Sequence, residues 1–363
     1  MAAGAPRIVL AAGGTAGHIE PALNLADAIG EQAPDAVLTV IGGTRGLEST
    51  LVPARGYDLR TVASVPMPRR PSIDLVLVWP RLHRATARAR DLLRELGASA
   101  VVGFGGYAAL PTYRAAHQLG LPIIVHEANA TPGLANRVAA RWTDLVFCSV
   151  PGAIRGARTL GLPLRRVIGE LDRPAMREAA RAELGLAPDG PVLLVFGGSQ
   201  GATRLNDVVA KSLDGLLASG VQVLHAYGSR NAPPASRPGY HPVAFIDRMD
   251  LAYAAADLAI VRGGAMTCAE LAAVGLPAAY VPLPIGNGEQ RRNALPVVQA
   301  GGGLLVENDA FTAEWLSANV LPLLHDEGRL AVMGAAAAAH GVRDAAGTLA
   351  AVVLQAAGER TRT

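Results

Sequence analysis

The chain repeats one arrangement twice: a buried apolar strand runs into a glycine-rich turn and then into a helix. In the first copy the strand spans residues 7–12, the turn is Gly-Gly-Thr-Ala-Gly-His at residues 13–18, and the helix spans residues 21–29. The second copy has the same three parts, at residues 191–196, 197–202 and 205–217. A strand that leads directly into such a turn and helix opens a Rossmann-like unit, so the repeat predicts two of these units.

Further apolar runs with strand character alternate with helical patterns along both halves. They lie at residues 37–41, 100–103, 123–126, 145–148, 221–226 and 243–245. Because such alternation is typical of parallel sheets, we expect an α/β protein with two Rossmann-like parallel-sheet domains. The first domain is placed at residues 1–164 and the second at residues 165–341. The alanine-rich stretch 330–357 is expected to be helical with a break near Gly341, and residues 342–363 to pack back on the first domain.

Residues 257–293 contain the elements of a ligand site in the second domain. The expected order is a strand over 258–261, a turn at 262–265, a helix over 266–274 that ends at Gly275, a strand over 278–281 and a loop with Asn287, Glu289, Gln290 and Asn293. Free N–H groups at such a helix start suit phosphate. Glu270 could accept two hydrogen bonds from a ribose. Thr267 and Glu270 also fit a helix capping box, and both interpretations stay open.

Two other uses of a glycine turn fit the sequence less well. Neither turn has the G-x-G-x-x-G spacing of a nicotinamide dinucleotide site, and no acid follows the second strand of either half, which ends at Gly42-Gly43-Thr44 or at Ala226-Tyr227. Gly197-x-Ser199-x-Gly201 matches the nucleophile elbow of α/β hydrolases, which also needs a later acid and histidine. The later histidines lie in poor contexts for that role: His241, His325 and His340.

Composition restricts the partners and excludes several kinds of site. Half of the 363 residues are hydrophobic and 17% are charged, which indicates a well-buried globular protein. Aromatic residues make up only 4%, too few for a base-stacking surface, so nucleic acid is not an expected partner. No H-E-x-x-H, C-x-x-C or D-x-D motif occurs, and we expect neither a metal nor a cofactor. Cys148 and Cys268 are expected to be buried free thiols.

Polar residues also follow the strands of the first half. The segments are Gly103-Phe104-Gly105-Gly106-Tyr107 and His126-Glu127-Ala128-Asn129, and both are expected at the carboxyl edge of their sheet. His18 stands at a helix start, where the helix dipole disfavours imidazolium, so it is either a general base or a structural cap. For His126 and Glu127 we favour structural hydrogen bonds over catalysis.

Six motifs follow one another between Gly13 and Asn293. They read GGTAGHIEPALNLA, GFGGYAALP, HEANATPGLANR, VFGGSQGATRLN, FIDRMDLAYAAADL and RGGAMTCAEL with PLPIGNGEQRRNA. Together they resemble the MurG family, the UDP-N-acetylglucosamine–lipid I N-acetylglucosaminyltransferases of peptidoglycan synthesis. The resemblance implies the GT-B fold, two facing Rossmann-like domains with a cleft between them. It implies inverting, metal-independent transfer of N-acetylglucosamine from UDP-N-acetylglucosamine to the 4-hydroxyl of the muramyl sugar of lipid I, giving lipid II.

The resemblance also implies roles for individual residues. Ser199 matches the serine beside the donor diphosphate, Ile246 a residue beside the uracil, and Gln290 and Asn129 match side chains near the sugar. The rest of the donor-binding set is Thr15, Ala16, Gly17, Arg165, Ala265, Met266, Thr267, Cys268, Ala269 and, on the ribose, Glu270. His18 is the favoured general base and Glu127 its rival. Another GT-B glycolipid synthase and a non-catalytic nucleotide-sugar-binding subunit remain the alternatives.

The acceptor implied by the resemblance carries a polyprenyl chain, so the protein must reach a bilayer. The sequence lacks the run of about 18 apolar residues that spans a membrane, and peripheral docking on the cytoplasmic face of the cell membrane is expected. Residues 69–84 hold an apolar run between four arginines, a pattern that suits an anionic membrane surface, with Leu75, Val78 and Trp79 in contact. A core helix with a solvated basic face is the alternative.

Overall fold

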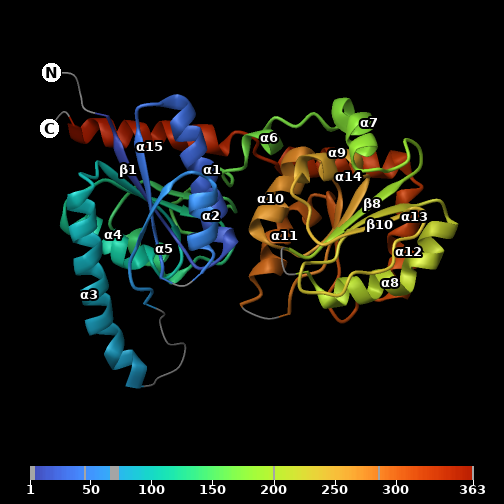
Figure 1. Ribbon diagram of the computed structural model, residues 1–363, viewed down its shortest axis with the longest axis horizontal. Coiled ribbons are helices and arrows are strands. Elements are labelled where there is room, and N and C mark those ends of the chain that lie inside the picture. Colours follow the sequence, from blue (N-terminus) through green and yellow to red (C-terminus); the bar gives the residue numbers. More distant parts are fainter. Residues whose placement is uncertain (1–4, 45, 66–72, 199–200, 285–286, 362–363) are drawn as a thin grey trace. The chain divides into compact units, whose positions relative to one another are not determined.

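The computed structural model describes residues 5–44, 46–65, 73–198, 201–284 and 287–361, with only the backbone described for residues 73–77 and 360–361. The chain divides into two compact units (Figure 1). Unit 1 comprises Met1–Arg165 and Asp344–Thr363, and unit 2 comprises Arg166–Arg343. Among the described residues, no helix is both long and apolar enough to cross a membrane.

Unit 1 is built on a seven-stranded parallel sheet with the strand order β3-β2-β1-β4-β5-β6-β7. Its strands are β1 (Arg7–Ala12), β2 (Val37–Gly42), β3 (Asp58–Thr61), β4 (Ala100–Gly105), β5 (Ile123–Glu127), β6 (Val146–Cys148) and β7 (Arg158–Thr159). Its helices are α1 (Ala16–Gln32), α2 (Glu48–Ala54), α3 (Ile73–Glu95), α4 (Ala109–Gln118), α5 (Leu134–Ala139) and α15 (Ala345–Thr361).

The central strand β1 is buried on both faces, because its alternate side chains point to opposite layers of helices. Ile8 and Leu10 pack in one core cluster with residues of α1 and with Val353 of α15. Val9 and Ala11 pack in a second cluster with residues of α3, α4 and α5. A strand covered on both faces has no polar alternation, which explains the unbroken apolar run at this point of the sequence.

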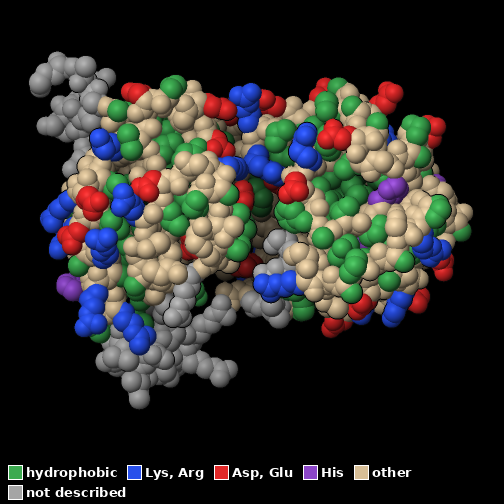
Figure 2. All heavy atoms as spheres, in the orientation of Figure 1, with side chains coloured by type: hydrophobic (Ala, Val, Ile, Leu, Met, Phe, Trp, Pro, Cys, Tyr) green, Lys and Arg blue, Asp and Glu red, His purple; other side chains and the backbone are tan. Residues whose placement is uncertain are grey.

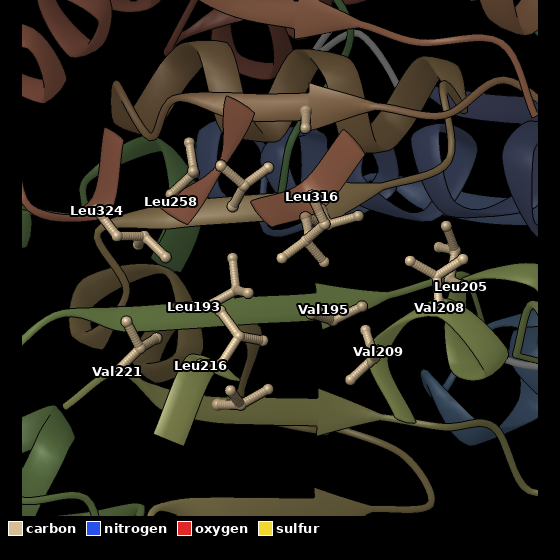
Figure 3. Close-up of a cluster of buried hydrophobic side chains, with 14 of the residues drawn as sticks. Leu193, Val195, Leu205, Val208, Val209, Leu216, Val221, Leu258, Leu316 and Leu324 are labelled. Carbon is tan, nitrogen blue, oxygen red and sulfur yellow. The ribbon is translucent and has the colours of Figure 1, made fainter. Parts of the chain in front are cut away.

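Unit 2 is built on a six-stranded parallel sheet with the order β10-β9-β8-β11-β12-β13. Its strands are β8 (Val192–Phe196), β9 (Gln222–Ala226), β10 (Tyr240–Val243), β11 (Leu258–Val261), β12 (Ala278–Tyr280) and β13 (Gly303–Leu305). Its helices are α6 (Arg166–Gly169), α7 (Arg173–Glu183), α8 (Thr203–Ala218), α9 (Met249–Ala255), α10 (Ala265–Val274), α11 (Glu289–Gln299), α12 (Ala313–Asn319), α13 (Leu321–Leu324) and α14 (Glu327–His340). On one face of the sheet, Leu193 and Val195 of β8 pack with Leu205 and Val209 of α8 and Leu316 of α12 (Figure 3).

Several predicted boundaries are confirmed. Helix α10 ends at Val274, and Gly275 takes the left-handed conformation, with φ 64°, that glycine adopts at low cost after a helix. The C-terminal helical stretch breaks between α14 and α15, at Gly341.

Other predicted boundaries are wrong, among them the start of α8, which lies at Thr203 rather than at residue 205. Helix α1 begins at Ala16, so Pro21 lies inside it rather than at its start. The strand expected at residues 243–245 is β10, which ends at Val243, because its partner strand β9 ends at Ala226, opposite Val243. The sequence also gave no signal for the short strands β3, β7 and β13, which have four residues or fewer.

Candidate functional site

Each sheet reverses its strand order at one point, between β1 and β4 in unit 1 and between β8 and β11 in unit 2. Connections after these strands leave in opposite directions, and open α/β sheets bind ligands outside the carboxyl ends at such a point. The first glycine turn follows β1, and the turn at Arg262-Gly263-Gly264 follows β11. Most of the predicted site residues therefore gather at two places, one in each unit.

In unit 1, His18 lies where the first glycine turn meets the end of β4. Thr15 is the N-cap residue of α1, and its Oγ1 lies 3.3 Å from His18 Nδ1. A Cβ atom placed on Gly105 would lie 3.5 Å from His18 Nε2, so the imidazole packs against this glycine. Gly106 has φ +88°, and a Cβ there would clash with the carbonyl oxygen of Gly13. The glycine turn after β1 and the glycine pair after β4 are therefore in backbone contact, and His18 lies beside this contact.

Glu127, at the end of β5, orders the loop that follows it. It is 2% exposed, and it accepts hydrogen bonds from the N–H of Asn129 at 2.9 Å, from the N–H of Gly133 at 3.0 Å and from Asn136 Nδ2 at 2.9 Å. Tyr113 donates to the Oδ1 of Asn136 at 2.9 Å and so fixes the orientation of that amide. Both carboxylate oxygens accept hydrogen bonds from this segment, an arrangement that suits the structural role favoured from the sequence.

The helices that follow the glycine turns start without side-chain caps. In the described part of the chain, α1, α8 and α10 have no side-chain cap hydrogen bond and no acid in the first turn. Helices α12 and α14 are capped by Thr312 and Asp326. A first turn with uncapped N–H groups and the positive end of the helix dipole attracts anions, so these three helix starts suit phosphate.

Glu270 lies one turn inside α10 and is 7% exposed. The fully buried Tyr253 donates its hydroxyl to Glu270 Oε2 at 2.7 Å. The N-cap residue is Gly264, so Thr267 is the third residue of the helix and cannot act as the cap of a capping box with Glu270. Cys268, on the same helix, is a buried free thiol whose pKa is raised to about 12 by burial, so it is an unreactive thiol.

The loop expected to carry Glu289, Gln290 and Asn293 is wrong at these positions, because all three residues lie in α11. The start of this helix is anchored to the turn after β11. A Cβ on Gly263 would clash with the backbone carbonyl of Gln290, so the two segments are in close contact. Asn293 Nδ2 donates to the carbonyl of Gly263 at 3.3 Å, and the Oε1 of Gln290 accepts from the N–H of Leu283 at 2.9 Å. Gln290 is thereby held beside the turn that precedes α10.

For three of the remaining residues predicted to bind the donor, the structure gives the degree of burial. Ile246 is 7% exposed and lies three residues beyond β10, while Arg165 and Asn129 are half-buried. Ser199 lies outside the described residues. The sequence interpretation assigned no role to Glu48, Tyr113, Asn136 or Tyr253. Asn136 and Tyr253 belong to motifs quoted above, which was the only signal available for them.

The structure separates the residues predicted to contact a membrane. Val78 is 2% exposed and packs with Val65, Leu82 and Ala85, so its assignment to the membrane surface is corrected: it is a core residue. Trp79, the next residue of α3, is 65% exposed, and the side chain of Leu75 lies outside the described residues. Figure 2 shows basic side chains gathered over α3, where the exposed arginines are Arg81, Arg84, Arg88 and Arg94.

Comparison with known proteins identifies both units. Residues 8–148 match the glycosyltransferase family 28 N-terminal domain, and residues 192–349 match the corresponding C-terminal domain. A UDP-N-acetylglucosamine–N-acetylmuramyl-(pentapeptide) pyrophosphoryl-undecaprenol N-acetylglucosamine transferase of Streptomyces avermitilis is 55% identical, over 98% of this chain and 99% of its own length. The enzyme of that name from Mycolicibacterium smegmatis is 53% identical, over 96% and 94%.

Solved structures agree with these matches. The crystal structure of Acinetobacter baumannii MurG superposes with a TM-score of 0.77 at 25% identity, over 97% of this chain and 99% of that one. A Streptomyces glycosyltransferase, SsfS6, solved with thymidine diphosphate, superposes with a TM-score of 0.62 at 18% identity, over 96% and 99%, and supports the fold alone. The chain therefore has the GT-B fold class and belongs to the MurG family, the UDP-N-acetylglucosamine–N-acetylmuramyl-(pentapeptide) pyrophosphoryl-undecaprenol N-acetylglucosamine transferases.

Proposed function

We propose that this chain transfers N-acetylglucosamine from UDP-N-acetylglucosamine to the 4-hydroxyl of the muramyl sugar of lipid I, giving lipid II in peptidoglycan synthesis. The observation that carries the proposal is the identity of 52–55% with transferases of this name over nearly the whole chain. The uncapped helix starts at both switch points supply the anion sites that a nucleotide sugar and a lipid diphosphate need.

Unit 2 is proposed to bind the UDP part of the donor. The diphosphate is proposed to lie at the start of α10, against the backbone of Ala265 to Ala269, because a helix start stabilises a leaving diphosphate without a cation. The resemblance to the family assigns Ser199 to the same group. Glu270 accepts hydrogen bonds from the ribose, and the hydrogen bond from Tyr253 holds its carboxylate in place. Ile246 packs beside the uracil.

The transferred sugar is proposed to contact Gln290 and Asn129. Gln290 uses its Oε1 on the N–H of Leu283, so it presents its amide nitrogen as the donor to a sugar hydroxyl. Asn129 is held by its N–H bond to Glu127. Thr15, Ala16, Gly17 and Arg165 complete the proposed set, whose contacts require the donor in place.

His18 is proposed as the general base of a single in-line displacement at the anomeric carbon. A sugar hydroxyl is a weak nucleophile until its proton is removed. Thr15 Oγ1 lies 3.3 Å from Nδ1. We propose the tautomer in which Nδ1–H donates to this hydroxyl, so that Nε2, on the side of Gly105, is the nitrogen that accepts the proton.

Docking on an anionic membrane surface is proposed to use α3. The support is an exposed Trp79 next to four exposed arginines on one helix, and the undecaprenol named for the substrate of the relatives. An aromatic ring enters the lipid interface while the guanidinium groups contact anionic headgroups. Val78 then anchors the same helix to unit 1 from the buried side.

The proposal is tested with the purified chain, UDP-N-acetylglucosamine and a lipid I analogue with a short prenyl chain, with product mass as the readout. We expect transfer of one N-acetylglucosamine, with inversion and without loss of rate in the presence of a chelator. UDP-glucose serves as the matched donor. Transfer from UDP-glucose alone would identify a different glycolipid synthase, and no transfer from either donor would favour the non-catalytic alternative.

A further inference from the structure

Unit 1 contains a buried acid that the proposed function does not use. Glu48, the first residue of α2, is 1% exposed. Its Oε1 accepts hydrogen bonds from the backbone N–H groups of Gly14 and Gly43, both at 2.9 Å. These N–H groups belong to the turns that follow β1 and β2, so a single carboxylate joins the carboxyl ends of two neighbouring strands.

Three glycines provide the space that this side chain fills. A Cβ atom on Gly13 would lie 2.6 Å from Glu48 Oε1, and one on Gly42 would lie 2.7 Å from Glu48 Cγ. A Cβ on Gly46 would clash with Oε2. Any larger residue at these positions would displace the carboxylate, so the absence of side chains at these glycines is what makes room for Glu48.

A Rossmann unit that binds a nucleotide uses the same two places differently. There the glycine turn after the first strand donates N–H groups to phosphate, and an acid after the second strand binds a ribose. In unit 1 the acid is Glu48, five residues after Gly43, and its side chain points back to the glycine turn that follows β1. A carboxylate and a phosphate are both anionic acceptors, so Glu48 gives the N–H of Gly14, which lies just before the N-cap of α1, an acceptor from within the chain.

We propose that Glu48 is a built-in anion that holds the first glycine turn in one conformation and thereby positions His18. Gly14 is followed by Thr15, whose carbonyl accepts the N–H of His18 at 3.0 Å and whose hydroxyl lies near the His18 ring. A turn released from Glu48 shifts Thr15 and His18 together. Glu48 is therefore a positioning residue, and this step rests on the proposed function of His18.

The burial of the Glu48 side chain costs free energy at its second oxygen, Oε2. Its Oε2 has no hydrogen-bond partner among the described residues. A buried carboxylate oxygen without a partner costs free energy, and the two backbone donors at Oε1 are the contacts that offset it. If Glu48 holds the turn through these two hydrogen bonds, both the charge and the length of its side chain should affect turnover. A glutamine keeps an acceptor but loses the charge, and an aspartate is one methylene too short.

The test compares E48A, E48Q and E48D with the parent chain, and D35A is the matched control because Asp35 is an exposed acid just before β2, at its amino end. We expect E48A to lower kcat by roughly 10- to 100-fold, as small misplacements of catalytic groups do, with UDP affinity unchanged. E48D should behave like E48A, E48Q should lie between, and D35A should match the parent. Formate, a free carboxylate that fits the vacated space, should raise the turnover of E48A in a saturable way, whereas chloride should not.

Amide hydrogen exchange supplies a second readout that does not depend on catalysis. The amides of Gly14 and Gly43 should be protected in the parent and exchange faster in E48A and E48Q, while the amide of Leu10 in β1 stays protected. Formate should restore the protection in E48A but not in E48Q, where the glutamine side chain fills the space. Unchanged exchange at Gly14, or a loss of kcat that formate does not restore and that follows the fraction of folded protein, overturns the proposal. If E48A does not fold, E48Q and G42A, whose Cβ would lie 2.7 Å from Glu48 Cγ, carry the same test. If the parent shows no transfer, the proposed function fails, and the exchange data still decide whether Glu48 holds the turn.

Discussion

Replacing Glu270 by alanine separates a donor-binding role from a structural one. In the folded chain the carboxylate is 7% exposed and accepts the hydroxyl of Tyr253 at 2.7 Å. If it also accepts from the ribose, its loss removes a hydrogen bond to a charged group, which weakens UDP binding by about 2–3 kcal/mol, or ~30- to 150-fold in Kd. The variant also leaves the buried hydroxyl of Tyr253 without its acceptor, which lowers the free energy of unfolding by roughly 1–3 kcal/mol.

The assay measures UDP affinity by calorimetry and stability by urea unfolding on the same samples. Thr312→Ala is the matched control, because it removes the cap of α12 in the same unit and costs about 1 kcal/mol of stability without touching α10. Tyr253→Phe removes the donor but keeps the carboxylate, so it should lower stability and change UDP affinity less than E270A does. A destabilised E270A variant that binds UDP as well as the parent would refute the ribose contact.

Three further changes probe other parts of the chain. His18→Ala should lower turnover by about 100-fold or more with UDP affinity unchanged, and near-normal turnover would remove His18 from the role of base. His225 is buried between Tyr240 and Asn206, and burial lowers its pKa to about 4 from an ordinary value of 6.5. In the unfolded chain His225 is protonated below about pH 6.5, whereas in the folded chain it stays neutral down to about pH 4. The free energy of unfolding therefore falls as the pH drops from 6.5 to 4, by up to about 3 kcal/mol. Urea unfolding at pH 7 and pH 5 should show a smaller loss for His225→Gln than for the parent, and equal losses would contradict the assignment. Trp79→Ser with Arg84→Glu should weaken binding to anionic vesicles, by about 1 kcal/mol or more, and leave transfer to a soluble acceptor intact. Val78→Ser should instead lower stability, and vesicle binding by the Trp79 and Arg84 variant equal to the parent's would place the docking surface elsewhere.

Local patterns were sufficient for much of the fold. The strand at the start of the chain, the end of α10 at Gly275 and the break at Gly341 follow from apolar runs and glycines, whose effects act within a few residues. Short edge strands such as β3 and β7 could not be predicted, because they form only where a neighbouring strand offers backbone partners. The end of β10 was misplaced for the same reason, since it is set by the length of β9.

Motifs in the sequence indicated the family, while the contacts of individual residues depended on the folded chain. The motif around His126 and Glu127 did not reveal that Glu127 is enclosed by donors from Asn129, Gly133 and Asn136. Thr267 and Glu270 fit a capping box on spacing alone, and only the position of the N-cap at Gly264 excluded it. Spacing along a helix limits which side chains share a face, but the helix start decides what they can bond.

Two α/β units with glycine turns, the family and the strand, turn and helix within residues 257–274 could all be predicted from the sequence, because these features depend on short motifs in a fixed order. Tertiary structure decided that Val78 is buried and Trp79 exposed, although the two residues are adjacent and both apolar. It also decided that the acid missing after the second strand is present as Glu48, folded back into the first glycine turn. The physical reason is the same for both: burial and hydrogen bonding are set by residues distant in the chain, such as Val65 against Val78 and Gly14 against Glu48, and no local pattern contains that information.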